Sequence, residues 1–221
     1  MNDSEAATKT AGPKSVPKTT RLKILKAARK VFGEHPYHSA SIRMIGKAAG
    51  LDHPLVSYYF RSKADLFEAV LAGVCEEYYE ANAKWFQGLA EMDPESGLTL
   101  YIDRLIDFTS GHPETFRILL LNMVQAKESD MIPGYRFIEN LFDRAVQTFK
   151  KVVPMRASDH DIDMFTRSFN TLIVNYLGAG TYYASTLGLS PDSVEYLEWV
   201  KKTLISMFLP HLKGLIKRKG A

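Results

Sequence analysis

The chain has 221 residues, of which 46% are hydrophobic, and its formal net charge is +3. This length and composition suffice for one large or two small hydrophobic cores and exclude a chain that is disordered throughout. No apolar run approaches the roughly 18 residues that a membrane span needs, and the single cysteine, Cys75, cannot form a disulfide framework. Residues 1–19 lack periodicity and an apolar segment, so we expect a flexible tail, no signal peptide and a cytoplasmic protein.

Charge is unevenly distributed along the chain. Residues 1–63 carry twelve Lys or Arg and four Asp or Glu, a net charge of +8, whereas residues 64–221 carry sixteen and twenty-one, a net charge of −5. A basic segment attracts a polyanion, since each neutralised phosphate releases counterions, and the acidic remainder is repelled. The asymmetry therefore favours a nucleic-acid partner. For the tail alone, a solvated basic segment is the competing interpretation.

The expected elements begin with a basic amphipathic helix over Arg21–Phe32, whose apolar residues fall along one side. Two short helices follow within Ser41–Lys63. The apolar residues from Ile42 to Ala49 recur at helical spacing, and Gly50 can adopt the positive φ at which a helix ends. Asp52 can cap the second short helix, which tolerates a proline in its first turn. Two short helices joined at a glycine predict a helix-turn-helix that can enter a major groove.

The segments SIRMIGKAAGL and YYFRSKADLF, with the helix before them, resemble the TetR family of bacterial regulators over about Arg21 to Val70. This resemblance implies an all-α fold. It also implies a three-helix DNA-binding domain at residues 20–65 and a larger helical effector-binding and dimerisation domain at residues 66–221. Members of the family act as homodimeric one-component regulators, mostly repressors, that bind a palindromic double-stranded operator and are released by a small-molecule effector.

Two positions depart from the family pattern. Gly46 stands where alanine is usual, which costs about 1 kcal/mol of helix propensity. Ser57 stands where a tyrosine is common, so Tyr58 is expected to replace one phosphate or base contact.

The expected DNA contacts combine phosphate anchors at helix starts with a recognition surface on the second short helix. Imidazole, hydroxyl, phenol and isobutyl groups suit base edges and the thymine methyl. The expected contact residues are Ser41, Arg43, His53, Pro54, Leu55, Ser57, Tyr58 and Lys63.

Beyond Lys63 the periodicity is helical throughout, with nine or ten helices in the whole chain. The expected ranges are 63–88, 98–111, 113–126, 133–153, 159–187 and 190–209. Ser158 is expected to cap the fifth of these ranges, and its acidic neighbours to stabilise the first turn.

The last two ranges combine broad apolar faces with small residues, which favours close helix approach in a dimer. Burial against the chain's own core explains the same pattern equally well. The expected interface residues are Leu177, Gly180, Ala184, Leu197 and Leu204.

The middle helices carry aromatic and amide side chains of the kind that line a ligand pocket, although ordinary core packing explains any single aromatic. The ligand expected from them is mostly apolar or aromatic. The expected pocket residues are Trp85, Tyr101, Phe108, Phe116, Met123, Phe137, Asn140, Phe165, Asn170 and Tyr176.

Motifs for catalysis, phosphate cradling and metal binding were sought, and the sequence contains no G-x-S-x-G, H-E-x-x-H or C-x-x-C. We therefore expect no enzyme activity, no catalytic residue, no cofactor and no metal site. Two other functions remain as alternatives: an architectural DNA-binding protein without an effector and a small helical enzyme.

Overall fold

The computed structural model describes residues 18–125, 132–154 and 156–216, and its elements in that part are helices. The expected all-α fold is confirmed. The helices are α1 (Lys18–Glu34), α2 (Ile42–Ala49), α3 (His53–Tyr59), α4 (Lys63–Trp85), the 3-10 turn η1 (Leu89–Glu91), α5 (Pro94–Gly111), α6 (Thr115–Met123), α7 (Arg136–Val152), α8 (Asp159–Gly178), α9 (Gly180–Thr186) and α10 (Val194–Leu215).

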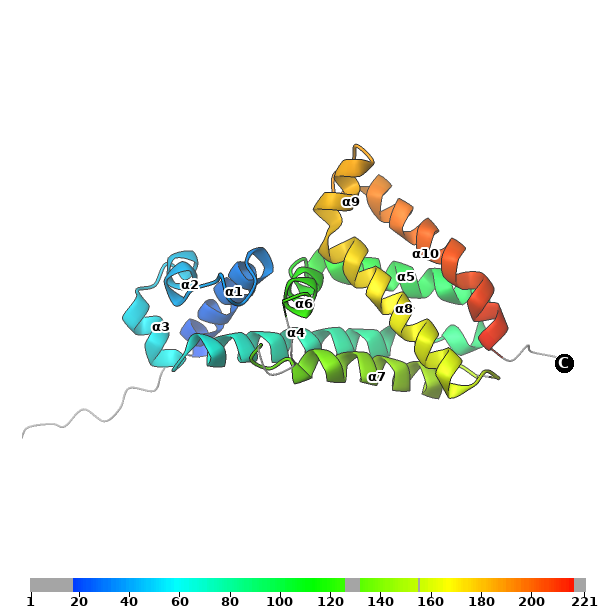
Figure 1. The fold of residues 1–221 in the computed structure, drawn as a ribbon, viewed down its shortest axis with the longest axis horizontal. Helices are drawn as coiled ribbons and strands as arrows, with labels where there is room; N and C mark the ends of the chain where they lie inside the picture. Colours follow the sequence, from blue (N-terminus) through cyan, green and yellow to red (C-terminus); the bar gives the residue numbers. More distant parts are fainter. Residues whose placement is uncertain (1–17, 126–131, 155, 217–221) are drawn as a thin grey trace, which may run out of the picture.

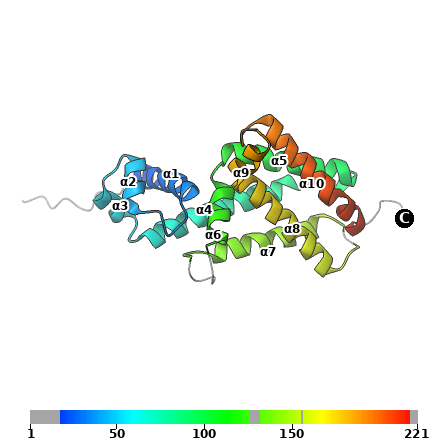
Figure 2. The ribbon, with the colours of Figure 1, turned by 45° about the horizontal axis from the view of Figure 1, so that its top comes forward.

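The molecule is elongated, with α1–α3, here called the head, at one end, and α5–α10, here called the body, at the other (Figure 1). Helix α4 joins the two and lies beside α7. In the body, α8 packs on α6, α7 and α10, while α10 also packs on α5. Figure 2 shows α6 next to the head, at the near end of the body. Helix α6 therefore contacts both α1 in the head and α8 in the body.

The head has its own apolar centre, which the start of α4 completes. Phe32 and Phe67 meet edge to face with ring centroids 4.7 Å apart. These packed side chains hold the helix-turn-helix against α1 and α4; the fully buried ones are Ile24, Ala28, Phe32, Ile45, Val56, Leu66, Phe67 and Leu71. The proposed division at residue 65 thus falls inside the first turn of α4, which runs unbroken from the head into the body.

Several helix ends differ from the expected ones. Helix α1 begins at Lys18, inside the predicted tail, whose first 17 residues lie outside the described part of the chain. Helix α5 begins at Pro94 rather than residue 98, because the side chain of Asp93 accepts from the backbone amides of Glu95 and Ser96. Helix α6 ends at Met123; the predicted end, residue 126, lies outside the described residues.

The predicted single helix over 159–187 was wrong, because the chain breaks at Ala179, between two glycines with low helix propensity. The predicted end of the last helix at 209 was also wrong. Helix α10 continues past Pro210 to Leu215, and Leu212 and Leu215 are buried beyond the proline. The expected cap at Ser158 is confirmed, since its side chain accepts from the backbone amide of Asp161.

Three of the expected interface residues lie inside the subunit. Ala184 and Leu204 are fully buried, and a Cβ at Gly180 would lie 3.4 Å from the Cβ of Pro191. These three positions therefore pack the chain against itself, and placing them at a dimer interface was wrong. The remaining two, Leu177 and Leu197, are partly exposed.

Candidate nucleic-acid interface

The turn between α2 and α3 is built by caps at both ends of α2. The Ser41 hydroxyl accepts from the backbone amide of Met44 at 3.2 Å. At the other end Gly50 has φ 60° and ψ 41°, and the Leu51 amide donates to the Gly46 carbonyl at 2.9 Å. A left-handed residue that closes the last helical turn is the expected role of glycine here. The predicted corner of the helix-turn-helix is thereby confirmed.

The unusual glycine inside α2 has a steric explanation. A Cβ at Gly46 would lie 2.9 Å from the carbonyl oxygen of Leu51, which is closer than side chains approach backbone oxygen. The turn therefore passes directly over Gly46. The local cost in helix propensity is offset by this close approach of α2 and the chain that leads into α3.

Helix α3 divides its residues between core and solvent. Asp52 occupies the N-cap position without a side-chain hydrogen bond, so the expected position is right but the expected capping bond is absent. Val56 is fully buried, while the Tyr58 side chain is 69% exposed. The expected base-reading residues divide likewise: His53, Pro54 and Ser57 are exposed, and Leu55 is half-buried.

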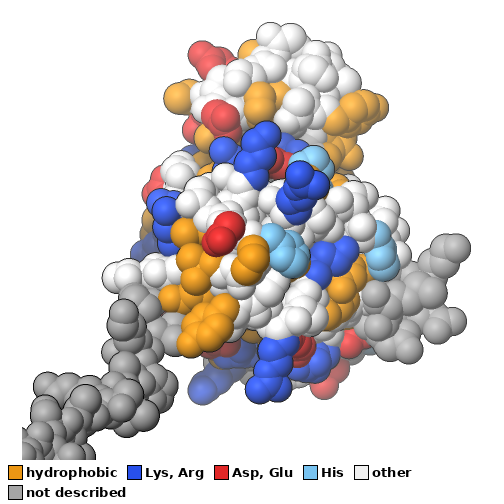
Figure 3. Space-filling view, turned by 90° about the vertical axis from the view of Figure 1, so that its left-hand side faces the viewer, with side chains coloured by type: hydrophobic (Ala, Val, Ile, Leu, Met, Phe, Trp, Pro, Cys, Tyr) orange, Lys and Arg blue, Asp and Glu red, His pale blue; other side chains and the backbone are white. Residues whose placement is uncertain are grey.

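A hollow between α2 and α3 carries several groups that can bind phosphate. Two exposed cations in its lining, Arg43 and Lys47, lie one helical turn apart. The residues that form the lining are Ser41, Arg43, Met44, Lys47, Leu51 and His53. Figure 3, which faces this end of the molecule, shows Lys, Arg and His side chains spread around apolar groups, with scattered acidic ones. Lys47 was absent from the expected contacts, although its i+4 spacing from Arg43 was a usable signal.

Lys63 is held more tightly than a free phosphate anchor. Its ammonium donates to the carbonyl oxygens of Tyr37 at 2.9 Å and Ala40 at 3.0 Å, and it lies 4.4 Å from the centre of the Tyr37 ring. Two of its three N–H donors therefore fix the loop before α2. A phosphate contact by Lys63 stays a prediction and would use the third.

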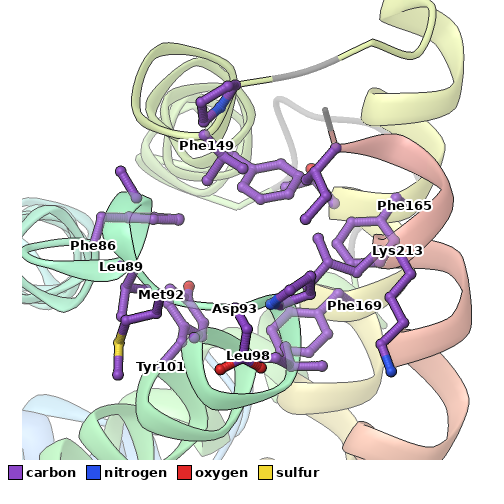
Figure 4. A pocket seen from close by; sticks show the side chains of 18 of the residues that line it. Phe86, Leu89, Met92, Asp93, Leu98, Tyr101, Phe149, Phe165, Phe169 and Lys213 are labelled. Carbon is purple, nitrogen blue, oxygen red and sulfur yellow. The ribbon is translucent and has the colours of Figure 1, made fainter. Parts of the chain in front are cut away.

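The body contains a partly open cavity of about 630 Å³ between the end of α4, η1, α5, α7, α8 and α10. Figure 4 shows the rings of Phe86, Tyr101, Phe149, Phe165 and Phe169 around one open space. Its size lies within the range of small-molecule sites, roughly 300–1,000 Å³.

Three of the expected pocket residues, Tyr101, Phe165 and Asn170, line this cavity. The others do not line this cavity. Phe116, for example, is buried where α6 crosses α8, while Asn140 is exposed. The remaining residues outside its lining are Trp85, Phe108, Met123, Phe137 and Tyr176.

Sequence reasoning missed Phe149, Phe169 and Leu212, which do line the cavity. Their apolar periodicity indicates that these side chains are buried, but it does not show that they line a cavity. Among the residues that the structure describes, no group of three or more His, Cys, Asp or Glu could hold a metal. Within the same ranges, no helix has the length and apolarity needed to cross a membrane.

Comparison with known proteins agrees with this arrangement. Residues 24–70 match the model of the bacterial regulatory proteins of the tetR family. The HTH-type transcriptional repressor NicS of Pseudomonas putida is 37% identical over 100 residues, which are 45% of this chain and 46% of that protein. The HTH-type transcriptional regulator BetI of Yersinia pestis is 24% identical over 136 residues, which are 61% of this chain and 69% of BetI.

The fold extends the likeness beyond the head. The crystal structure of a tetR-family transcriptional regulator from Streptomyces coelicolor matches with a TM-score of 0.63 at 18% identity, covering 90% of this chain and 82% of that one. The match to NicS thus spans about half the length of each protein. With its helix-turn-helix and its all-helical body, the chain is similar to the TetR family of bacterial regulatory proteins: residues 24–70 match the family's model, and the fold matches that of a solved tetR-family regulator.

Proposed function

We propose that this protein is a homodimeric transcriptional repressor that binds a palindromic operator through α2 and α3 and is released from it by a small molecule. The observation that carries the proposal is the exposed side of α3, held at a basic end of the molecule by the buried Val56. The names of the relatives support a regulator rather than an enzyme. Because its partner is DNA, the proposal includes a cytoplasmic location.

A dimer follows from the length of α3. One seven-residue helix reaches few base pairs, and two copies related by a two-fold axis double the sequence that is read. The outward sides of α8 and α10 are the proposed interface in place of the buried residues named above. Met164 on α8 and Met207 on α10 are 49% and 52% exposed.

Helix α6 is the proposed link between cavity and DNA. On the head side, Arg117 donates to the Gly33 carbonyl at 2.9 Å, and the Tyr37 amide donates to Asn122 at 3.2 Å. On the body side, a Cβ at Gly178 of α8 would lie 2.6 Å from the Phe116 carbonyl oxygen. Helix α8 also lines the cavity, so a ligand that shifts α8 must move α6 and with it the head. A ligand then lowers operator affinity by its preference for the shifted state.

Selection from a random duplex DNA library tests the proposal without knowledge of the operator. We expect the enriched sequences to be palindromic, and the purified protein to bind them in a gel-shift assay with a strong salt dependence. Enrichment without any shared sequence would support an architectural DNA-binding protein instead. The absence of DNA binding would remove the proposed function.

Analytical ultracentrifugation tests the dimer separately. Met207→Lys places a charge on the proposed interface and should shift the protein toward monomer, with weaker operator binding. Val124→Lys is the matched control, because Val124 is 69% exposed at the end of α6. A dimer that both variants leave intact would move the interface away from α10.

A further inference from the structure

Three phenylalanine rings in nearly parallel planes line the cavity of the body. The rings of Phe149 and Phe165 are 18° from parallel with centroids 5.6 Å apart, and those of Phe165 and Phe169 are 6° from parallel at 6.2 Å. These three side chains come from α7 and α8 and face the open space together (Figure 4). Rings arranged in this way favour a flat aromatic ligand, which can meet a ring face in offset stacking or a ring edge, over a bulky aliphatic group.

Polar groups in the cavity wall belong to a buried network of two separate parts. The Asn82 amide donates to the Tyr101 hydroxyl at 2.6 Å. The Tyr78 hydroxyl donates to the side-chain oxygen of Asn170 at 3.2 Å, and the Asn170 amide donates to the Thr166 carbonyl at 2.8 Å. Tyr101, Thr166 and Asn170 line the cavity, so this network supplies its polar wall.

The network leaves two donors over at the cavity wall, and one buried acceptor, Asn82 Oδ1, behind it. Tyr101 accepts from Asn82, and its own hydroxyl hydrogen has no acceptor among the residues that the structure describes. Burial raises the pKa of Tyr101, which keeps that hydrogen in place at neutral pH. Asn170 uses one of its two amide hydrogens on Thr166. Asn82 does not line the cavity, so the unused groups that a ligand atom meets at this wall are the two donors, and an acceptor is the best match for them.

Charged groups are confined to the rim. Asp93 caps α5 through the backbone amides of Glu95 and Ser96, and it is exposed. Lys213 lies 3.5 Å from the Glu95 carboxylate, and its side chain extends away from the open space (Figure 4). Of the charged lining residues, Glu91, Asp93 and Lys213 are all exposed. A charge deep in the cavity would thus be buried without a partner of opposite sign, which is costly.

We propose that the cavity binds a flat, uncharged aromatic molecule whose carbonyl oxygen or ring nitrogen accepts hydrogen bonds from Tyr101 and Asn170. The inference rests on the proposed function, because it names the chemical class of the effector. The ring system lies against Phe149, Phe165 and Phe169, and the acceptor points to the polar wall.

Four rigid probes of nearly equal shape test this class: 9-fluorenone, fluorene, fluorenone-4-carboxylate and protonated 9-aminofluorene. Calorimetric titration of the full chain should show 9-fluorenone bound about three- to tenfold more tightly than fluorene, the usual value of a hydrogen bond. The charged probes should bind more weakly than 9-fluorenone. Tyr101→Phe should reduce the advantage of 9-fluorenone over fluorene, because only the Asn170 hydrogen bond remains, and should leave the affinity for fluorene unchanged.

Infrared spectroscopy gives a readout that does not depend on affinity. The carbonyl stretch of bound 9-fluorenone should fall in frequency relative to an apolar solvent, and part of the shift should disappear in Tyr101→Phe. Ala145→Phe narrows the cavity and is the control for its location: both neutral probes should lose binding.

Equal binding of fluorene and 9-fluorenone by the unmodified protein, an unshifted carbonyl stretch, tightest binding by a charged probe, or no binding of any probe would each overturn the proposal. Gel shifts with the selected DNA, run without probes, separate this result from the proposed function. If DNA binds and no probe does, the ligand class is wrong and the regulator stands. If 9-fluorenone binds selectively and no DNA does, the ligand class stands and the regulator falls.

Discussion

The head and the body place their functional side chains on opposite sides of their hydrophobic cores. In the head, α3 turns Val56 inward and leaves His53 and Tyr58 in solvent, so the proposed DNA contacts lie on an outer surface. In the body, Tyr101 and Phe165 line the partly open cavity, so the proposed ligand contacts lie between the helices. A substitution on the head's outer surface should change binding and spare stability. In the body, the same residues pack the core and line the cavity, so a substitution there should change both stability and ligand binding.

The largest effect is expected where α6 and α8 meet. A Cβ at Gly178 would lie 2.6 Å from the Phe116 carbonyl oxygen, so Gly178→Ala should lower the free energy of unfolding by about 3 kcal/mol, as overpacking does. Urea denaturation measures it. Gly73→Ala on α4 is the matched control, because nothing lies within 4 Å of its Cβ position, and it should stabilise by about 0.5–1 kcal/mol. Equal effects at the two glycines would mean that α6 and α8 are farther apart.

On the head's outer surface, His53→Ala and Tyr58→Ala should each weaken binding to the selected operator by about 1–3 kcal/mol. Because both side chains are exposed, the melting temperature should hardly change. Fluorescence anisotropy and thermal denaturation of the same preparations measure the two quantities. Val56→Ala is the control at a buried position, and its main effect should be a lower melting temperature. A large loss of stability from Tyr58→Ala would place that ring in the core.

Lys63 tests whether a basic residue near the DNA-binding surface stabilises the fold or contacts phosphate. Lys63→Met removes the hydrogen bonds to the carbonyls of Tyr37 and Ala40, so the free energy of unfolding should fall by about 1–2 kcal/mol. Lys47→Met, at an exposed position, should leave stability unchanged. If Lys63→Met keeps full stability and instead flattens the salt dependence of DNA binding, its ammonium serves phosphate rather than the loop.

The smallest effect is expected for the cations of the hollow. Arg43→Ala and Lys47→Ala should each weaken binding to all DNA sequences alike, and each should reduce the slope of log affinity against log salt by about 0.9. Titrations at several salt concentrations, with selected and unrelated DNA, measure this slope. A loss confined to the selected DNA would reassign the residue to a base edge.

Local patterns account for most of what could be predicted in the head. The positive φ at Gly50, the cap at Ser41 and the inward side of α3 depend on residues within a few positions of one another. Their chemistry is therefore visible in a short window of sequence. The reason for a glycine at position 46 is not visible in such a window, because the Leu51 carbonyl leaves no room for a Cβ only after the turn has folded over α2.

Sequence alone determined that this chain is helical, that it carries a helix-turn-helix near a basic end, and which side of α3 faces outward. Tertiary structure decided which aromatics line the cavity, that Gly180 and Ala184 pack within the subunit, and that Lys63 holds a loop. The physical reason is that apolar periodicity shows that a side of a helix is buried but does not identify its partner. Core, cavity and dimer interface offer helices the same apolar environment, and only contacts between residues distant in the chain distinguish them.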